Sequence, residues 1–196
     1  LRWQPGDLLF EPRSKRVEDP GVEELARCDD EAADEPLRSR YWSTTPYMWG
    51  QGGAVKHSVR PCDGEDVEGR IGDESENFLR EAMGVHLSQT EGCFEFLVQL
   101  QKDAESMPIE DATIPWQEEF SPFVKVATVR IPMQEFDTKE QDELCEHLSF
   151  NPWHTLPEHR PLGNINRTRR IVYDMISAYR HQLNGVSERE PEGHEF

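Results

Sequence analysis

The chain has no stretch long and apolar enough to cross a membrane as a helix, and this bounds its class. A membrane-spanning helix needs about 18 or more consecutive apolar residues, and the 196-residue sequence contains no such run. A secretory signal peptide is not recognisable either. The sequence therefore predicts a protein without a membrane span, long enough for one domain or slightly more.

Basic residues are scarce. The chain has 21 Lys and Arg against 39 Asp and Glu, which gives a formal net charge of -18. Because phosphate backbones are bound by clustered Lys and Arg, this balance excludes a nucleic-acid surface and disfavours anionic membranes. The arginines gather instead in residues 160–180. Such a segment in an acidic protein predicts either a ligand carrying carboxylates or a salt-bridged internal helix.

Cysteine is sparse and its spacing is uninformative. Cys28, Cys62, Cys93 and Cys145 stand far apart, without a C-x-x-C pair or a Cys/His metal spacing. We therefore predict four free thiols. Free thiols are typical of a reducing compartment, so the predicted localisation is the cytoplasm.

The common catalytic signatures are also missing. The chain has no G-x-S-x-G, P-loop or dinucleotide fingerprint, so hydrolase, kinase and dehydrogenase interpretations have no support. His147, His154 and His159 are spaced by seven and five residues, which fits no usual zinc pattern. We interpret them as structural or surface histidines. Glu110 and Asp111 lie in an acidic loop, where solvation or capping is favoured over acid–base catalysis.

Turn residues and hydrophobic patterns divide the chain into an acidic arm or linker over 1–40, a folded part over 41–185 and a flexible tail over 186–196. Strands followed by helices favour an α+β fold. The arm contains one predicted helix, over 20–33. In the folded part we predict strands over 41–45, 54–60, 93–100 and 123–131, and helices over 76–89, 137–148 and 165–184.

The last predicted helix carries an unusual constellation. Arg169, Tyr173 and Arg180 are spaced by four and seven residues, which places them on one helical face. A phenol flanked by two guanidinium groups has its anion stabilised, so its pKa is expected to fall. A tyrosinate of this kind can serve as the axial ligand of haem iron. A surface helix with solvated arginines explains the same spacing, so both interpretations stand.

Six segments, which together span more than half of the chain, carry a resemblance to a known family. They are 41–60, MPIEDAT at 107–113 with Trp116, SPFVKVA at 121–127, LSFNPWH at 148–154, HRPLGNINR at 159–167, and the R-x-x-x-Y spacing of 169–173. In this order they resemble the catalase superfamily, and in particular its short bacterial branch of catalase-related haem proteins.

The resemblance implies a fold and a set of residue roles. Residues 41–185 would form the second half of an antiparallel β-barrel, with the C-terminal helix on the proximal side of haem b. Tyr173 matches the proximal iron ligand, and Arg169 matches the arginine that keeps this tyrosine ionised. Arg180 matches an arginine that faces the haem edge and its propionate. Phe150 would line the haem pocket.

The resemblance also implies a function, acting on hydrogen peroxide or organic hydroperoxides. The family's distal His and Asn, which assist O–O cleavage, belong to the first half of the fold. Nothing in 1–40 resembles them, and the first histidine is His57. A catalase or peroxidase activity would need a distal half from an upstream segment or another chain. The alternative is a non-catalytic half of a split or partner-completed barrel. Because natural proteins seldom leave strand edges open, both readings predict a dimer or a partner chain.

Overall fold

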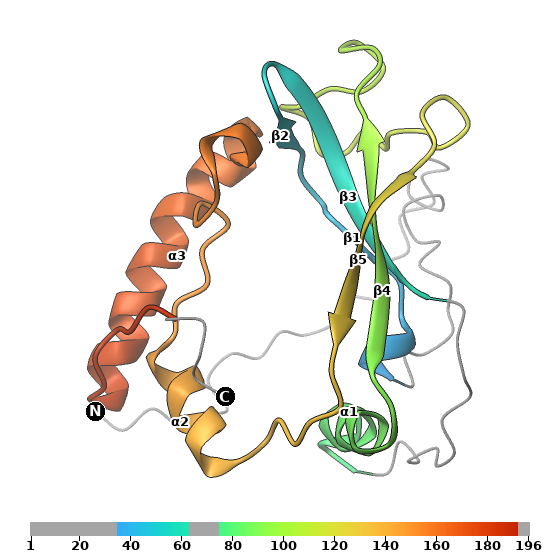
Figure 1. Ribbon diagram of the computed structural model, residues 1–196. Coiled ribbons are helices and arrows are strands. Elements are labelled where there is room, and N and C mark those ends of the chain that lie inside the picture. Colours follow the sequence, from blue (N-terminus) through green and yellow to red (C-terminus); the bar gives the residue numbers. More distant parts are fainter. Residues whose placement is uncertain (1–34, 63–74, 192–196) are drawn as a thin grey trace, which may run out of the picture. The chain divides into compact units, whose positions relative to one another are not determined.

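The structure, a computed structural model, describes residues 35–62 and 75–191. The predicted helix over 20–33, most of the acidic arm and most of the acidic loop after Cys62 lie outside these residues. Within them the elements follow in the order η1 Pro36–Arg38, β1 Tyr41–Trp42, β2 Tyr47–Trp49, β3 Gly53–Pro61, α1 Phe78–Gln89, β4 Gly92–Leu100, β5 Val124–Ile131, α2 Lys139–His147, η2 Pro157–His159 and α3 Gly163–Asn184 (Figure 1).

The strands form one antiparallel sheet in the order β1-β3-β4-β5, and β2 also pairs with β3. In this register His57 stands opposite Val98 on β4. The predicted α+β class with an antiparallel sheet is confirmed. β2 was not predicted, because Pro46 and the glycines at 50, 52 and 53 read as a turn. The sheet is open at β5 in the described part of the chain, so the predicted barrel is not seen there.

Two apolar clusters form the core. The first joins Leu37 of η1, Leu87 of α1 and Phe94 of β4. The second is made of three buried residues from β3 and the loop between β4 and β5, namely Ala54, Met107 and Trp116. Leu37 lies within the predicted arm, yet only 6% of it is exposed. Residues just before β1 are therefore packed against the sheet and α1.

Helix α1 begins two residues later than its sequence pattern suggests. Ser75, just before the predicted helix, is a residue type favoured as N-cap, but the structure places Asn77 at that position, without a side-chain capping bond. The Ser75 hydroxyl instead accepts a hydrogen bond from the Asn77 amide and donates one to Glu81. Ser75 thus closes the turn before the helix. Leu79, in the first turn of α1, is 38% exposed.

Short-range interactions close the start of α2 and the end of α3. Thr138 caps α2 through a reciprocal pair with Gln141, in which each side chain accepts a hydrogen bond from the other residue's backbone. α3 ends at Asn184, and Gly185 follows with φ of 67°, in the left-handed region that favours glycine. Both helix boundaries could therefore be predicted from local sequence.

The prediction of four free thiols is wrong for two of them. Cys62, at the end of β3, and Cys93, in β4, form a disulfide. They are register partners, because Pro61 pairs with Phe94 and the Cys62 amide donates to the Cys93 carbonyl at 3.0 Å. Cys145 is free and exposed, and Cys28 lies outside the described residues. Disulfides are rare in cytosolic proteins, so the cytoplasmic localisation loses its main support and stays a prediction.

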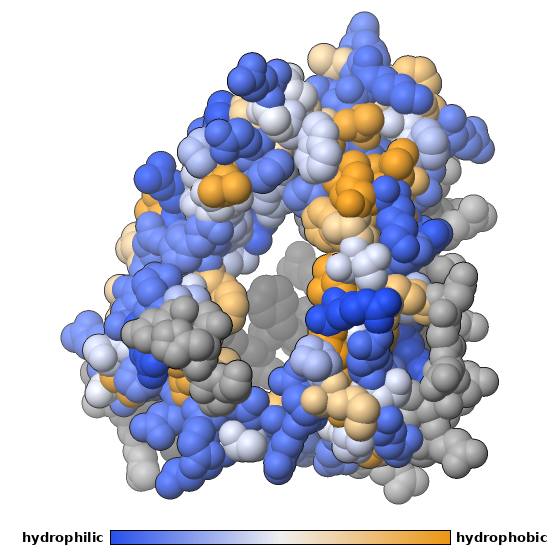
Figure 2. Space-filling model, viewed as in Figure 1, coloured by the Kyte–Doolittle hydropathy of each residue, from blue (hydrophilic) through white to orange (hydrophobic). Residues whose placement is uncertain are grey.

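Several apolar side chains of β5 and α3 are exposed. Figure 2 shows such side chains gathered over the strands. The exposed apolar residues of β5 are Val124, Val126 and Val129, and those of α3 include Val172, Met175, Ile176, Tyr179 and Leu183. Contiguous exposed apolar surface is typical of an interaction site. No helix in the described ranges combines the length and the apolarity that a membrane span requires.

Candidate functional site

The site is built around the N-terminal half of α3, which backbone contacts hold against β2. The Met48 amide donates to the Arg160 carbonyl, and the Leu162 amide donates to the Pro46 carbonyl. Tyr47 also forms a bridge with Pro161. These contacts join the residues just before α3 to the strand that pairs with the middle of the sheet. The start of α3 is therefore fixed by tertiary contacts, since Leu162 provides no side-chain cap.

Glu110 supplies the cap that Leu162 does not. One of its carboxylate oxygens accepts from the Asn164 amide at 2.8 Å, and both accept from the Arg167 guanidinium at 3.1 Å. The Arg167 hydrogen bond, followed by the Asn164 amide, holds the pKa of Glu110 below its usual range. Asp111 accepts from Thr113 in a local turn. Glu110 thus takes the capping role, one of the two that the sequence favours for this acidic pair, whereas Asp111 closes a local turn.

Tyr173 and Arg169 lie in direct contact on α3. Arg169 Nη2 donates to the phenol oxygen of Tyr173 at 3.0 Å, and the guanidinium carbon lies 5.1 Å from the ring centre. Burial opposes the charge on Arg169, but the hydrogen bond and charge of Tyr173, with a smaller contribution from Tyr47, raise the pKa of the guanidinium. Arg169 therefore stays charged beside two phenols. Tyr173 is 37% exposed, so its ring is accessible from one side.

Three stacked rings from β2, β3 and β4 lie near Arg169, and the sequence does not predict this arrangement. The Tyr47 ring lies 4.8 Å from the His57 ring, and His57 lies 5.2 Å from Phe96. Burial, and then the nearby charge of His159, lowers the pKa of His57 from its usual 6.5. His57 lies within the strand predicted over 54–60. Because β2 was read as a turn, nothing in the sequence placed Tyr47 next to it.

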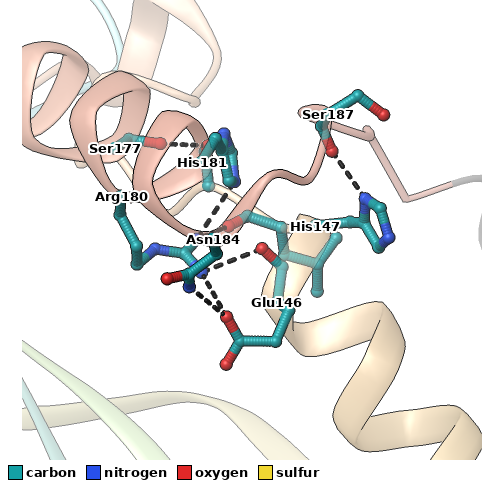
Figure 3. A network of polar contacts seen from close by, with 9 residues as sticks. Glu146, His147, Ser177, Arg180, His181, Asn184 and Ser187 are labelled. Atoms are coloured by element: carbon teal, nitrogen blue, oxygen red, sulfur yellow. Dashed lines mark hydrogen bonds and ion pairs between the residues drawn. The ribbon is translucent and has the colours of Figure 1, made fainter.

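Arg180 contacts α2 (Figure 3). Its guanidinium donates to the backbone carbonyl of Glu146 at 2.9 Å, to the Glu146 carboxylate at 3.3 Å and to the Leu148 carbonyl. Asn184 reaches the same carboxylate at 2.8 Å. A cation at these carbonyls satisfies helix-terminal acceptors and the negative end of the helix dipole. The expected contact of Arg180 with a haem propionate stays a prediction.

Phe150 has a largely accessible ring, with 73% of the residue exposed. The neighbouring Asn151 donates to the carboxylate of Asp174 on α3 at 2.6 Å. Trp153 donates its indole N–H to the Asn166 carbonyl of α3 at 2.8 Å. The segment around Phe150 is therefore anchored to α3, while the predicted role of its phenyl ring in a haem pocket stays untested.

The histidines of the 147–159 region have separate environments. His147 Nδ1 lies 2.6 Å from the Ser187 carbonyl, which joins α2 to the chain after α3 (Figure 3). The His159 ring lies 5.7 Å from the Trp49 ring. In residues 35–62 and 75–191 no group of three or more His, Cys, Asp or Glu side chains is arranged to hold a metal ion. Tyr173 is the metal ligand that the sequence resemblance implies, and it is not of these types.

Solved structures with the same architecture are catalases. A fungal catalase superposes with a TM-score of 0.61 at 15% identity, covering 77% of this chain and 32% of its own. A bacterial catalase superposes with a TM-score of 0.60 at 15% identity, covering 75% and 31%. Catalase A from Saccharomyces cerevisiae gives 0.60 at 14% identity, covering 80% and 36%. The fold is catalase-like.

Two features bound what this similarity establishes. The chain spans about a third of the length of these catalases, 32% of the fungal protein. At about 15% identity the superposition establishes the fold alone. No protein-family model matches the chain, and no curated protein matches it.

Proposed function

We propose that this chain is the proximal part of a catalase-related protein that binds haem b and acts on hydrogen peroxide or organic hydroperoxides. In this proposal Tyr173 is the axial ligand of the iron. The observation that carries it is the 3.0 Å hydrogen bond from Arg169 to the Tyr173 oxygen, on the last helix of a catalase-like fold. The same two residues match the R-x-x-x-Y spacing in the sequence.

The residues fit the cofactor by the chemistry of the donor. A tyrosinate oxygen is a known haem ligand, and an adjacent guanidinium favours the anionic form of a phenol. Arg169 has a raised pKa, so it remains a cation throughout the usual pH range. The phenol oxygen accepts one hydrogen bond from Arg169 and retains acceptor capacity for a metal. Arg180 and Phe150 are proposed to meet the propionate and the ring edge.

Haem, when bound, supplies the redox chemistry that cleaves a peroxide O–O bond. The protein's contribution is to hold the ligand oxygen, keep its negative charge and set the orientation of the ring. Arg169 is proposed to favour the anionic phenol through its hydrogen bond to the Tyr173 oxygen. The backbone contacts of residues 160–162 with β2 are proposed to orient α3 and with it the Tyr173 ring. The acid–base residue that peroxide cleavage needs is proposed to come from the distal half, from an upstream segment or a partner chain.

Haem titration of the full chain tests the proposal. Hemin is added to wild-type protein, to Tyr173→Phe and to Tyr179→Phe, and the Soret and charge-transfer bands are recorded. Tyr179 is a matched control because it lies on the same helix and is 59% exposed. We expect wild type and Tyr179→Phe to give a high-spin ferric-tyrosinate spectrum that Tyr173→Phe lacks.

Equal spectra for all three proteins would exclude Tyr173 as the ligand. A spectrum of free hemin throughout would remove the haem proposal altogether. If the expected pattern is obtained, oxygen release from hydrogen peroxide and consumption of an organic hydroperoxide separate the two substrate classes. Activity that appears only with a second chain or an upstream segment would identify the source of the distal residues.

A second candidate function is favoured by the open edge of β5. Val124, Val126 and Val129 are each more than 40% exposed, and open apolar edges invite strand pairing. In this alternative the chain is a non-catalytic half of a barrel that a partner chain or a second copy completes. Sedimentation analysis of the full chain together with the haem titration distinguishes the two. A complex that never binds haem would favour the alternative.

A further inference from the structure

Asn166 has no role in the proposed function, yet it is fully buried. Its exposed fraction is 0%, whereas Arg167, Thr168 and Arg170 beside it are exposed. Burying an amide without hydrogen bonds is unfavourable. A buried Asn on an otherwise exposed stretch of helix therefore calls for a specific set of partners.

The side chain uses all of its hydrogen-bonding capacity. Nδ2 donates to the Pro46 carbonyl at 3.1 Å and to the Leu162 carbonyl at 2.8 Å, and Oδ1 accepts from Thr45 Oγ1 at 3.1 Å and from Arg169 Nη1 at 3.3 Å. An Asn amide has two N–H donors and two acceptor positions. The two carbonyls fix which end is nitrogen, so the oxygen must face Thr45 and Arg169.

This arrangement determines the orientation of Arg169. A free Arg side chain has several rotatable bonds and loses considerable rotamer entropy when it is fixed. Here one guanidinium nitrogen is held by Asn166 and the other donates to Tyr173. A continuous set of hydrogen bonds thus runs from Thr45 and Pro46, before β2, through Asn166 and Arg169 to the phenol.

The neutrality of Asn166 matters as much as its position. In the described part of the chain, the polar partners of Arg169 are the Asn166 amide and the phenols of Tyr173 and Tyr47. The nearby Arg167, in contrast, pairs with the carboxylate of Glu110. A carboxylate at position 166 would orient Arg169 but would also neutralise it. An amide orients the guanidinium and leaves its charge available to the phenol.

We propose that Asn166 is a positioning residue that orients the Arg169 guanidinium onto the Tyr173 oxygen without neutralising its charge. The inference deepens the proposed function and rests on it, because the charge of Arg169 matters only if Tyr173 acts as an anion. Its geometric part concerns the protein alone and can be tested without haem.

The test is nuclear magnetic resonance of the haem-free full chain with 15N-labelled arginine. A guanidinium held at two nitrogens rotates slowly about its Cζ–Nη bonds and gives resolved Nη signals. We expect resolved signals for Arg169 in wild type. In Asn166→Ala we expect its rotation to be roughly fivefold faster, the factor that one typical hydrogen bond contributes. Unchanged Arg169 signals in folded Asn166→Ala would overturn the proposal.

Two further variants separate positioning from general stability. Thr45→Val removes one bond to Asn166 but leaves the Arg169 contact, so it should lower the melting temperature and keep the Arg169 signals resolved. Asn166→Asp keeps one acceptor oxygen but sets the other against the Pro46 and Leu162 carbonyls, so it should lower the melting temperature more than Thr45→Val does. Averaging of the Arg169 signals in Thr45→Val equal to that in Asn166→Ala would contradict a specific role of the Asn166 oxygen.

Should Asn166→Ala fail to fold, the wild type alone decides. A scalar coupling across the hydrogen bond between Arg169 Nη1 and the side-chain carbonyl carbon of Asn166 is expected, and its absence from well-resolved signals would overturn the inference. These readouts do not involve haem. Failure of the wild type to bind haem would therefore count against the proposed function, while the resonance data still decide the role of Asn166.

Discussion

Gly163 offers a sharp test of how α3 is positioned, because its backbone conformation and its surroundings both exclude a side chain. Its φ is 86°, and a Cβ added there would lie 2.8 Å from the backbone oxygen of Ile109. Gly185 provides a matched control, since its φ is 67° and a Cβ there would meet nothing within 4 Å. Alanine at either site is strained, but only at Gly163 does it also collide with the backbone.

The expected losses of unfolding free energy follow from these two contributions. A left-handed alanine costs about 1–2 kcal/mol, and the reduced entropy of the unfolded chain offsets about 0.4–1 kcal/mol of it. Gly185→Ala should therefore lose about 1 kcal/mol. Gly163→Ala should lose about 3 kcal/mol, because forcing atoms into a packed contact adds about 1–3 kcal/mol.

Urea denaturation followed by circular dichroism measures both values under identical conditions. The reasoning also predicts that Gly163→Ala weakens the fit of α3 against the loop at Ile109, so haem binding should fall together with stability. Equal losses for the two variants would refute the claim that the Ile109 contact positions the start of α3.

Three further predictions concern other parts of the fold. Replacing both Cys62 and Cys93 by Ser should lower the unfolding free energy by roughly 3–4 kcal/mol, the loop-entropy value for about 31 enclosed residues, and dithiothreitol should reproduce the loss in wild type but not in the variant. The pKa of His57 lies below its usual 6.5, so the unfolded chain takes up a proton first as pH falls below 6.5 and stability declines until the folded pKa is passed. His57→Phe, which preserves the ring stack, should flatten that part of a stability–pH curve, and an unchanged slope would contradict the assignment. Glu110→Gln should lower the melting temperature by removing the charged cap of α3, whereas the same substitution at the exposed Glu119 should not.

Local chemistry explains why most elements could be predicted. The predicted bounds of β3, β4, α2 and α3 depend on residues close in sequence, such as Thr138 before α2 and Gly185 after α3. They matched the structure to within a few residues. The start of α1 was predicted two residues early, because a Ser before a helix can close a turn as well as cap. β2 was missed because its three residues pair only through contacts with β3 and Pro161.

The contacts of the candidate site also fall into short-range ones, which the sequence predicts, and long-range ones, which it does not. The contact of Arg169 with Tyr173 follows from a spacing of four residues on one helix. Asn166 and Arg169 contact residues 45–47, which lie more than 100 residues earlier in the chain, and no local pattern brings these together. The Cys62–Cys93 disulfide was missed for the same reason, since it becomes geometrically possible only once β3 and β4 are in register. Sequence reasoning treated the four cysteines as unrelated.

A crystal structure of the full chain with bound haem tests the central claim most directly. We predict continuous density from the Tyr173 oxygen to the iron, with Arg169 still donating to that oxygen. Haem held by a histidine, or bound away from α3, would contradict the claim and leave a catalase-like fold with a different chemistry.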